Sequence, residues 1–171
     1  GGVNGLNIFN PKEILIDRFD PNIYITNLLI QNKVVLPNDR SGILQQSIEY
    51  TTSITLEPDQ EVLTLEFSAL DFRAPDQNKY RYQMVGIDQN WIESGSRRNV
   101  TYSHLPAGTY TFKVQGSNSL GNWGDKITEL KVIILPPWWA TWWAYCAYVL
   151  LLGVAIRAYL KHRLDQTKME A

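Results

Sequence analysis

The stretch LPAGTYTFKVQG, Leu105–Gly116, decides the fold class of this chain. After the turn signal Pro-Ala-Gly, the apolar residues Tyr110, Phe112 and Val114 alternate with polar ones, the pattern of a strand with one buried face. In immunoglobulin-like and fibronectin-III-like sandwiches, a tyrosine near the start of a late strand hydrogen-bonds back to upstream backbone, the tyrosine corner. Tyr110 therefore has two interpretations, a tyrosine corner or one more core aromatic.

Similar strand patterns recur on both sides of this stretch. They fall at residues 24–30, 62–70, 79–87 and 127–135, and clusters of Pro, Gly, Asn and Asp separate them. Short, half-buried strands at this spacing are typical of a sandwich. We therefore predict an all-β, immunoglobulin/fibronectin-III-like β-sandwich, with no helical period before Trp138.

The chain changes character after this β region. From Trp138 to Ile156 there are 19 residues without a charge, and as a helix they would span about 28 Å, close to the thickness of a bilayer. The aromatic belt at one end would be Trp138, Trp139, Trp142 and Trp143, and the basic residues at the other are Arg157, Lys161 and Arg163. The sequence predicts a single transmembrane α-helix, with residues 1–137 periplasmic and residues 157–171 cytoplasmic. The alternative is a hydrophobic helix or hairpin in a soluble protein.

Two prolines join the β region to this run. Pro136 and Pro137 end the preceding strand and are expected to pre-shape the start of the helix. A Pro-Pro joint is stiff, whereas a Gly/Ser linker would absorb motion. We expect it to act as a coupling junction.

Composition excludes several classes of function. The 16 basic and 17 acidic residues give a net charge of −1, so nothing in the bulk charge indicates nucleic-acid binding. Cys146 is the only cysteine, and the two histidines do not cluster with it at metal-ligand spacing. No nucleotide-binding motif occurs either. We therefore predict no cofactor, no metal and no enzyme activity in this segment, which we interpret as a piece of a longer polypeptide.

Two tryptophans in loop-like surroundings are candidates for binding. Trp91 and Trp123 could stack on sugar rings or on a partner protein. The alternative is that they cap the ends of the sandwich core.

A continuous motif of about 45 residues closely resembles the three-tyrosine (Y_Y_Y) domain of bacterial two-component regulators. Its pattern is Y-x-Y, G-x-D-x-x-W, an arginine loop, a third tyrosine, L-P-x-G-x-Y-x-F-x-V and a final G-x-W. In this chain the matching positions are Tyr80, Tyr82, Gly86, Asp88, Trp91, Arg98, Tyr102, Leu105, Pro106, Gly108, Tyr110, Phe112, Val114, Gly121 and Trp123.

The resemblance implies a domain order. Residues 1–15 would be the closing strand of an upstream β-propeller, 16–135 the three-tyrosine sandwich, 136–158 the transmembrane helix and 159–171 the start of a cytoplasmic signalling helix. It implies a sensor histidine kinase of the hybrid type in the bacterial inner membrane. The parent would be a homodimer that senses oligosaccharides through its propellers and regulates transcription, with the kinase downstream. The alternatives are a membrane-anchored carbohydrate-binding β-sandwich module and an inert spacer.

Overall fold

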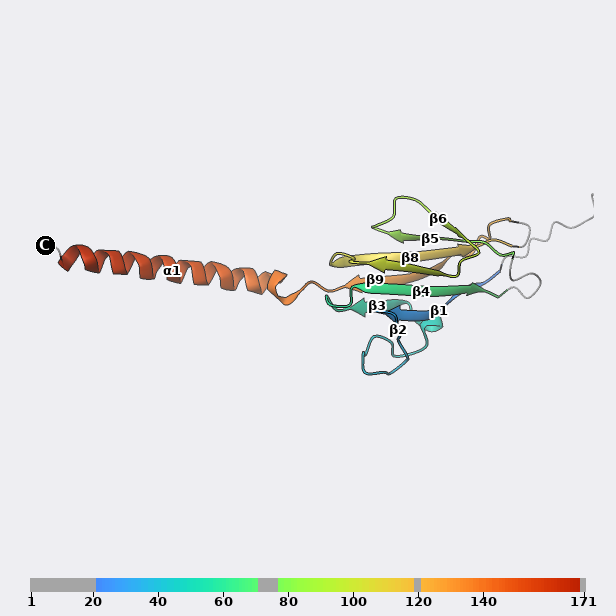
Figure 1. The fold of residues 1–171 in the computed structure, drawn as a ribbon, viewed down its shortest axis with the longest axis horizontal. Helices are drawn as coiled ribbons and strands as arrows, with labels where there is room; N and C mark the ends of the chain where they lie inside the picture. Colours follow the sequence, from blue (N-terminus) through green and yellow to red (C-terminus); the bar gives the residue numbers. More distant parts are fainter. Residues whose placement is uncertain (1–20, 71–76, 119–120, 170–171) are drawn as a thin grey trace, which may run out of the picture.

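The computed structural model describes residues 21–70, 77–118 and 121–169, which form two β-sheets followed by one long helix (Figure 1). The expected closing strand at residues 1–15 lies outside the described residues. Of the chain that the structure does describe, the body is the predicted β-sandwich and the end is the predicted apolar helix.

The first sheet has the strand order β2-β1-β4-β7, and all its neighbours are antiparallel. Its strands are β1 (Ile23–Ile30), β2 (Lys33–Val34), β4 (Val62–Ala69) and β7 (Asn99–Ser103). The second sheet has the order β3-β9-β8-β5-β6, in which only β3 and β9 are parallel. Its strands are β3 (Ser53–Leu56), β5 (Tyr80–Val85), β6 (Ile92–Gly95), β8 (Gly108–Gly116) and β9 (Thr128–Ile134). A short 3-10 helix, η1 (Ile48–Tyr50), precedes β3.

The core lies between the inward faces of the two sheets. Leu63, Leu65 and Phe67 of β4 face Phe112 and Val114 of β8, and all five side chains are almost fully buried. These are the alternating positions that the sequence assigns to one strand face. Burying such apolar area contributes about 25 cal/mol per Å², so this interface is the main stabilising term of the domain.

Four strands were not predicted. β2, β3, β6 and β7 have two, four, four and five residues, too short to show a clear period. β6 and β2 are edge strands with no buried residue, so neither carries an alternating apolar face. Their pairing depends on their neighbours and not on a local pattern.

The long helix α1 (Trp142–Met169) starts later than predicted. Trp138–Ala140 form a separate 3-10 turn, η2, and Thr141 is extended, with φ −85° and ψ 154°. The helix expected over residues 136–158 therefore begins at Trp142, because the extended Thr141 separates α1 from the 3-10 turn. Residues Trp142–Arg163 of α1 are long and apolar enough to cross a membrane.

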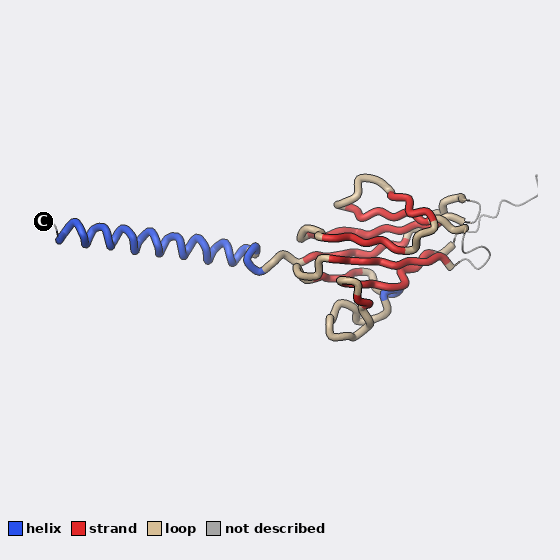
Figure 2. Tube along the Cα trace, viewed as in Figure 1, coloured by secondary structure: helices blue, strands red, loops and turns tan. Residues whose placement is uncertain are grey.

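The described chain runs from one end of the sandwich to the other. The carbonyl of Ile23, at the start of β1, accepts a hydrogen bond from the Thr128 hydroxyl at the start of β9. The opposite end of β9, Ile134, leads directly to the helix. Figures 1 and 2 show α1 leaving the sandwich along the direction of its strands.

Candidate functional site

Tyr110 makes the tyrosine-corner hydrogen bond. Its hydroxyl donates to the carbonyl oxygen of Pro106, at 2.9 Å, while its ring is buried under the turn after β5. A Cβ on Gly86 would lie 2.9 Å from the Tyr110 ring, and Gly86 has a positive φ of 101°. Gly108 lies against the other end of the same side chain. These two motif glycines give the ring its space.

Asp88 is a hydrogen-bond acceptor that fixes another tyrosine. Its Oδ2 accepts from the Tyr102 hydroxyl and from the Met84 backbone N–H, both at 2.7 Å. Burial, followed by the hydrogen bond to Asp88, raises the pKa of Tyr102 well above its usual value. Burial and the Asp88 charge also raise the pKa of Tyr82. Both phenols therefore stay neutral over the physiological range, which suits a structural role.

The three tyrosines of the motif form one aromatic cluster. Tyr80 lies 5.4 Å from Phe67 between ring centroids, and its hydroxyl accepts from the Ala69 N–H at 3.1 Å, so it ties the two sheets together. Tyr82 and Tyr102 meet edge to face at 6.3 Å. Tilted and edge-to-face contacts of this kind add to the stabilisation from burial.

Trp91 and Trp123 both lie against one arginine. The Arg81 guanidinium carbon is 5.1 Å from the Trp91 ring centroid and 4.5 Å from that of Trp123. Arg81 Nε also donates to Gln115 Oε1 at 2.7 Å, and the Gln115 amide donates to the Gly124 carbonyl. Arg81 occupies a face of each indole ring, which is then not open to a ligand.

Sequence reasoning missed Arg81 and Gln115 as partners in this stack. In the sequence Arg81 is simply the polar residue between Tyr80 and Tyr82. The available signal was that its register partner on β8 is the polar Gln115, but this pairing is visible only in the sheet. Gln115 is 6% exposed although it lies on the outer face of the sheet, because the stack covers it.

The junction between sandwich and helix is held by successive hydrogen bonds. The Leu135 N–H donates to the Leu56 carbonyl at 3.0 Å, so β9 is paired up to the residue before Pro136. In η2 the Ala140 N–H donates to the Pro137 carbonyl at 2.9 Å. The Thr141 hydroxyl then reaches back to the Trp138 carbonyl at 2.6 Å.

The first turn of α1 continues these contacts. The Thr141 carbonyl accepts from the N–H groups of Ala144 and Tyr145, at 3.0 and 3.3 Å. The Tyr148 hydroxyl donates to the Trp139 carbonyl at 3.4 Å. The path from strand to helix therefore has a defined local structure.

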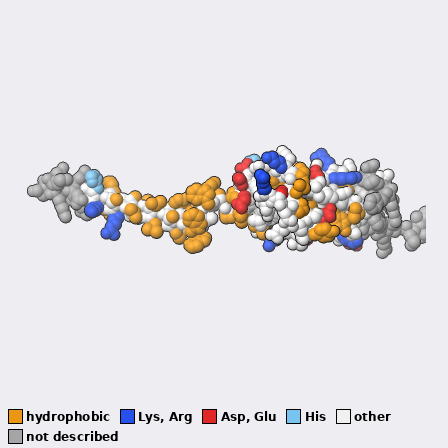
Figure 3. Space-filling model, turned by 90° about the horizontal axis from the view of Figure 1, so that it is seen from below, with side chains coloured by type: hydrophobic (Ala, Val, Ile, Leu, Met, Phe, Trp, Pro, Cys, Tyr) orange, Lys and Arg blue, Asp and Glu red, His pale blue; other side chains and the backbone are white. Residues whose placement is uncertain are grey.

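The predicted membrane-interface residues lie at the two ends of the apolar surface of α1 and η2. At the sandwich end lie four tryptophan residues that are from 51% to 79% exposed: Trp138, Trp139, Trp142 and Trp143. At the far end, the exposed basic side chains are Arg157, Lys161 and Arg163. Figure 3 shows the hydrophobic side chains along the helix and the basic ones gathered beyond them.

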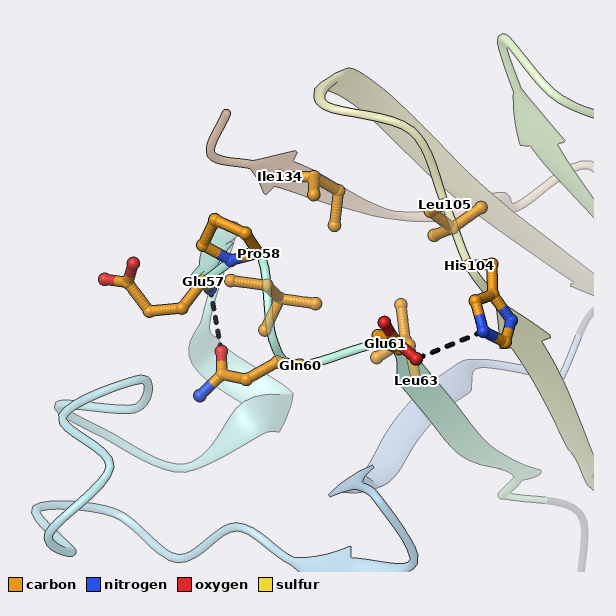
Figure 4. A pocket seen from close by; sticks show the side chains of 9 residues that line it. Glu57, Pro58, Gln60, Glu61, Leu63, His104, Leu105 and Ile134 are labelled. Carbon is orange, nitrogen blue, oxygen red and sulfur yellow. Dashed lines mark hydrogen bonds and ion pairs between the residues drawn. The ribbon is translucent and has the colours of Figure 1, made fainter. Parts of the chain in front are cut away.

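Two connected hollows lie where the sandwich meets the helix. The smaller, of about 210 Å³, lies beside the loop of residues 57–61, where Glu61 pairs with His104 at 3.1 Å (Figure 4). The larger, of about 830 Å³, is lined by that loop, by Leu105 and Ala107, and by residues 134–141. We call this larger hollow the junction groove. Its acidic side was missed because EPDQ looks like an ordinary turn.

No group of three or more His, Cys, Asp or Glu side chains that could hold a metal ion occurs within the described ranges. The distinctive geometry of the described part lies instead in the tyrosine cluster and the junction. Both consist of packing contacts and hydrogen bonds.

The described structure defines a class: an all-β sandwich joined by a short, structured linker to one candidate membrane helix. Residues 71–135 match the family model of the Y_Y_Y domain. These residues are therefore similar to the Y_Y_Y domain, and the chain resembles an extracellular sensory domain, not a catalytic one.

Known proteins of this class are similar over most of the chain. Histidine kinase P4 of Formosa agariphila is 31% identical over 180 residues, which cover 99% of this chain and 13% of that kinase. The extracellular domain of BT4673 from B. thetaiotaomicron, described as a hybrid two-component system, superposes with a TM-score of 0.62. It is 32% identical and covers 70% of this chain, which spans 16% of that structure.

A second solved structure shares the fold. The extracellular domain of BT3049 from B. thetaiotaomicron has a TM-score of 0.59 and 24% identity, over 75% of this chain and 17% of its own. The chain thus spans less than a fifth of the length of each relative. These similarities relate the chain to the extracellular domains of two-component systems, and α1 adds one candidate membrane span.

Proposed function

We propose that this chain is the signal-coupling part of a sensor histidine kinase of the hybrid two-component type. Upstream β-propellers would bind an oligosaccharide, and the sandwich would pass the change to the membrane helix. Residues 1–137 would lie in the periplasm, the helix in the inner membrane, and residues 157–171 in the cytoplasm ahead of the kinase. The parent would act as a homodimer, in which paired helices report the arrangement of the sandwiches.

The observation that carries this proposal is the structured junction. β9 is hydrogen-bonded on both sides by β3 and β8, so it moves with the second sheet. From Leu135 to Thr141 the path contains two prolines and a hydrogen-bonded 3-10 turn. A displacement of the sandwich is therefore transmitted to α1 and is not absorbed.

The first test measures the stiffness of the junction in this chain. Spin labels are placed on the native Cys146 and on Lys131→Cys, which is exposed on β9. In lipid nanodiscs we expect a narrow distance distribution between them. The double change Pro136→Gly/Pro137→Gly should broaden it, because glycine restores the backbone freedom that proline removes. Equal widths would contradict a stiff joint.

The second test is functional. In the complete receptor, the same double change should weaken ligand-dependent autophosphorylation several-fold while leaving ligand affinity unchanged. A matched control is Gly42→Ala, in a loop away from the junction that has open space around its Cα. Full signalling by the diglycine receptor would refute the coupling role, and loss of ligand binding would point to a folding defect.

The carbohydrate-binding alternative depends on Trp91 and Trp123 as a platform. Arg81 already lies against both rings, at 5.1 and 4.5 Å, so the stack is self-contained. No specific observation therefore favours this alternative. Sugar binding by the 171-residue chain that Trp91→Ala abolishes would revive it.

A further inference from the structure

The junction groove has an apolar floor and an acidic rim. The floor is made by Ile134, Leu135, Pro136 and the two indoles of η2, and the rim by the loop of residues 57–61. Its lining ends at Thr141, next to the candidate span that begins at Trp142. Figure 3 shows the red acidic side chains on the sandwich end that faces the helix.

The rim is held in shape by its own hydrogen bonds. The Gln60 N–H donates to the Glu57 carbonyl at 3.0 Å, and the Glu57 N–H donates to the Gln60 side-chain oxygen at 2.9 Å (Figure 4). The Asp59 carbonyl accepts from the Gln31 amide at 2.8 Å. The loop is thus a fixed support for its carboxylates.

Two of these carboxylates have no cationic partner. Glu61 pairs with His104, but no Lys, Arg or His of the described residues lies within ion-pair distance of Glu57 or Asp59. The groove lining contains no lysine or arginine. A cation that donates hydrogen bonds would be favoured at this rim. An anionic group would be repelled from the rim itself, so the anionic part of a zwitterion would have to lie on the side of the indole N–H groups.

The floor supplies a different chemistry. Trp138 and Trp139 meet edge to face at 5.6 Å and are 66% and 54% exposed. Indole rings at a membrane interface pair an apolar body with an N–H donor, which suits glycerol and ester groups. Apolar contact below and carboxylates above match one amphiphile, a phospholipid whose head group ends in an ammonium.

We propose that the junction groove binds the head group of phosphatidylethanolamine. The ammonium would donate to Glu57 and Asp59 at the rim. The phosphate would lie away from the rim and accept from the indole N–H groups, and the glycerol region would lie against the rings of Trp138 and Trp139. Phosphatidylcholine has the same net charge but its trimethylammonium has no N–H to donate, so it would bind more weakly. A lipid in this place would brace the joint between sandwich and helix. This inference depends on the proposed membrane span.

The experiment uses the 171-residue chain in nanodiscs that contain phosphatidylglycerol with either phosphatidylethanolamine or phosphatidylcholine. Lipids that stay bound after extraction are counted by native mass spectrometry. We expect at least threefold greater retention of phosphatidylethanolamine. Equal retention of the two, or greater retention of phosphatidylglycerol, would overturn the proposal.

Two double variants test whether the preference for phosphatidylethanolamine depends on the junction groove. Glu57→Gln/Asp59→Asn should reduce the preference to about one, whereas Glu49→Gln/Glu93→Gln removes the same charge elsewhere and should keep it. The single change Asp59→Asn, with an intermediate loss, guards against misfolding of the double variant. An unchanged preference in Glu57→Gln/Asp59→Asn would refute the assignment.

The same samples separate this inference from the function on which it rests. If the chain does not enter nanodiscs, the membrane span fails and the lipid site fails with it. If the chain enters them and retains both lipids equally, only the lipid site fails.

Discussion

At the residue scale, the burial of Tyr102 and its hydrogen bond to Asp88 should make the free energy of unfolding fall at alkaline pH. The folded state opposes ionisation of Tyr102, as its raised pKa shows, so the unfolded chain loses this proton first. The free energy of unfolding should therefore hold below about pH 10 and fall above it. Tyr102→Phe should lower stability at pH 7 by about 1–3 kcal/mol, because the hydrogen bond is lost. It should also flatten the decline above pH 10.

To test this, the chain is unfolded by heat in detergent at pH 7 and at several pH values above 10. Unfolding is monitored by the circular dichroism signal of the β-sheets. Tyr50→Phe is the control, since that side chain is 71% exposed. Parallel curves for the Tyr102→Phe variant and the parent chain would show that this phenol does not cause the alkaline loss.

Residue roles were only partly accessible from the sequence. The motif identified Tyr110, and its place after Pro-Ala-Gly allowed a tyrosine corner beside a simple core role. The distance of 2.9 Å to Pro106 shows the corner. The partnership of Asp88 with Tyr102 could not be derived, because 14 residues separate them and only the crossing from one sheet to the other brings them together.

At the element scale, the turn after β5 depends on Gly86. Its φ of 101° disfavours any side chain, and an added Cβ would lie 2.9 Å from the Tyr110 ring. Gly86→Ala should cost about 2–4 kcal/mol from strain and overpacking together. Gly42→Ala is the matched control, because Gly42 has a positive φ of 66° with open space around it. Urea unfolding of both variants would measure the difference, and equal losses would exclude the steric part.

Strands could be predicted from the sequence where buried and exposed side chains alternate along them. β4, β5, β8 and β9 bury alternating side chains and were recognised within one or two residues. The α-helix start was misplaced because Trp138 to Thr141 are uncharged like the helix itself. The break depends on the backbone of Thr141, which composition does not reveal.

At the scale of the whole molecule, the sandwich and α1 lie one after the other along a single axis (Figure 2). One copy of the chain can transmit a displacement from the sandwich to the helix. Two copies of the chain are needed if the signal is a change in the spacing between paired helices. The proposed function therefore predicts a dimer in the membrane. The candidate span exposes Val149, Leu150, Leu151 and Leu152, which leaves an apolar surface available to a second helix or to lipid.

Subunit counting tests this prediction directly, because Cys146 is the only cysteine and accepts one dye per chain. In liposomes at low protein density, we expect most labelled spots to bleach in two steps. In a second variant, Cys146→Ser/Lys131→Cys, the dye is attached to the sandwich instead of the helix. This variant shows whether a dye on the helix surface itself disturbs pairing. Two steps with both labels would support a dimer held by this chain. One step with both labels, at every protein density, would mean that this chain does not dimerise by itself, and the pairing of helices would then require other parts of the receptor.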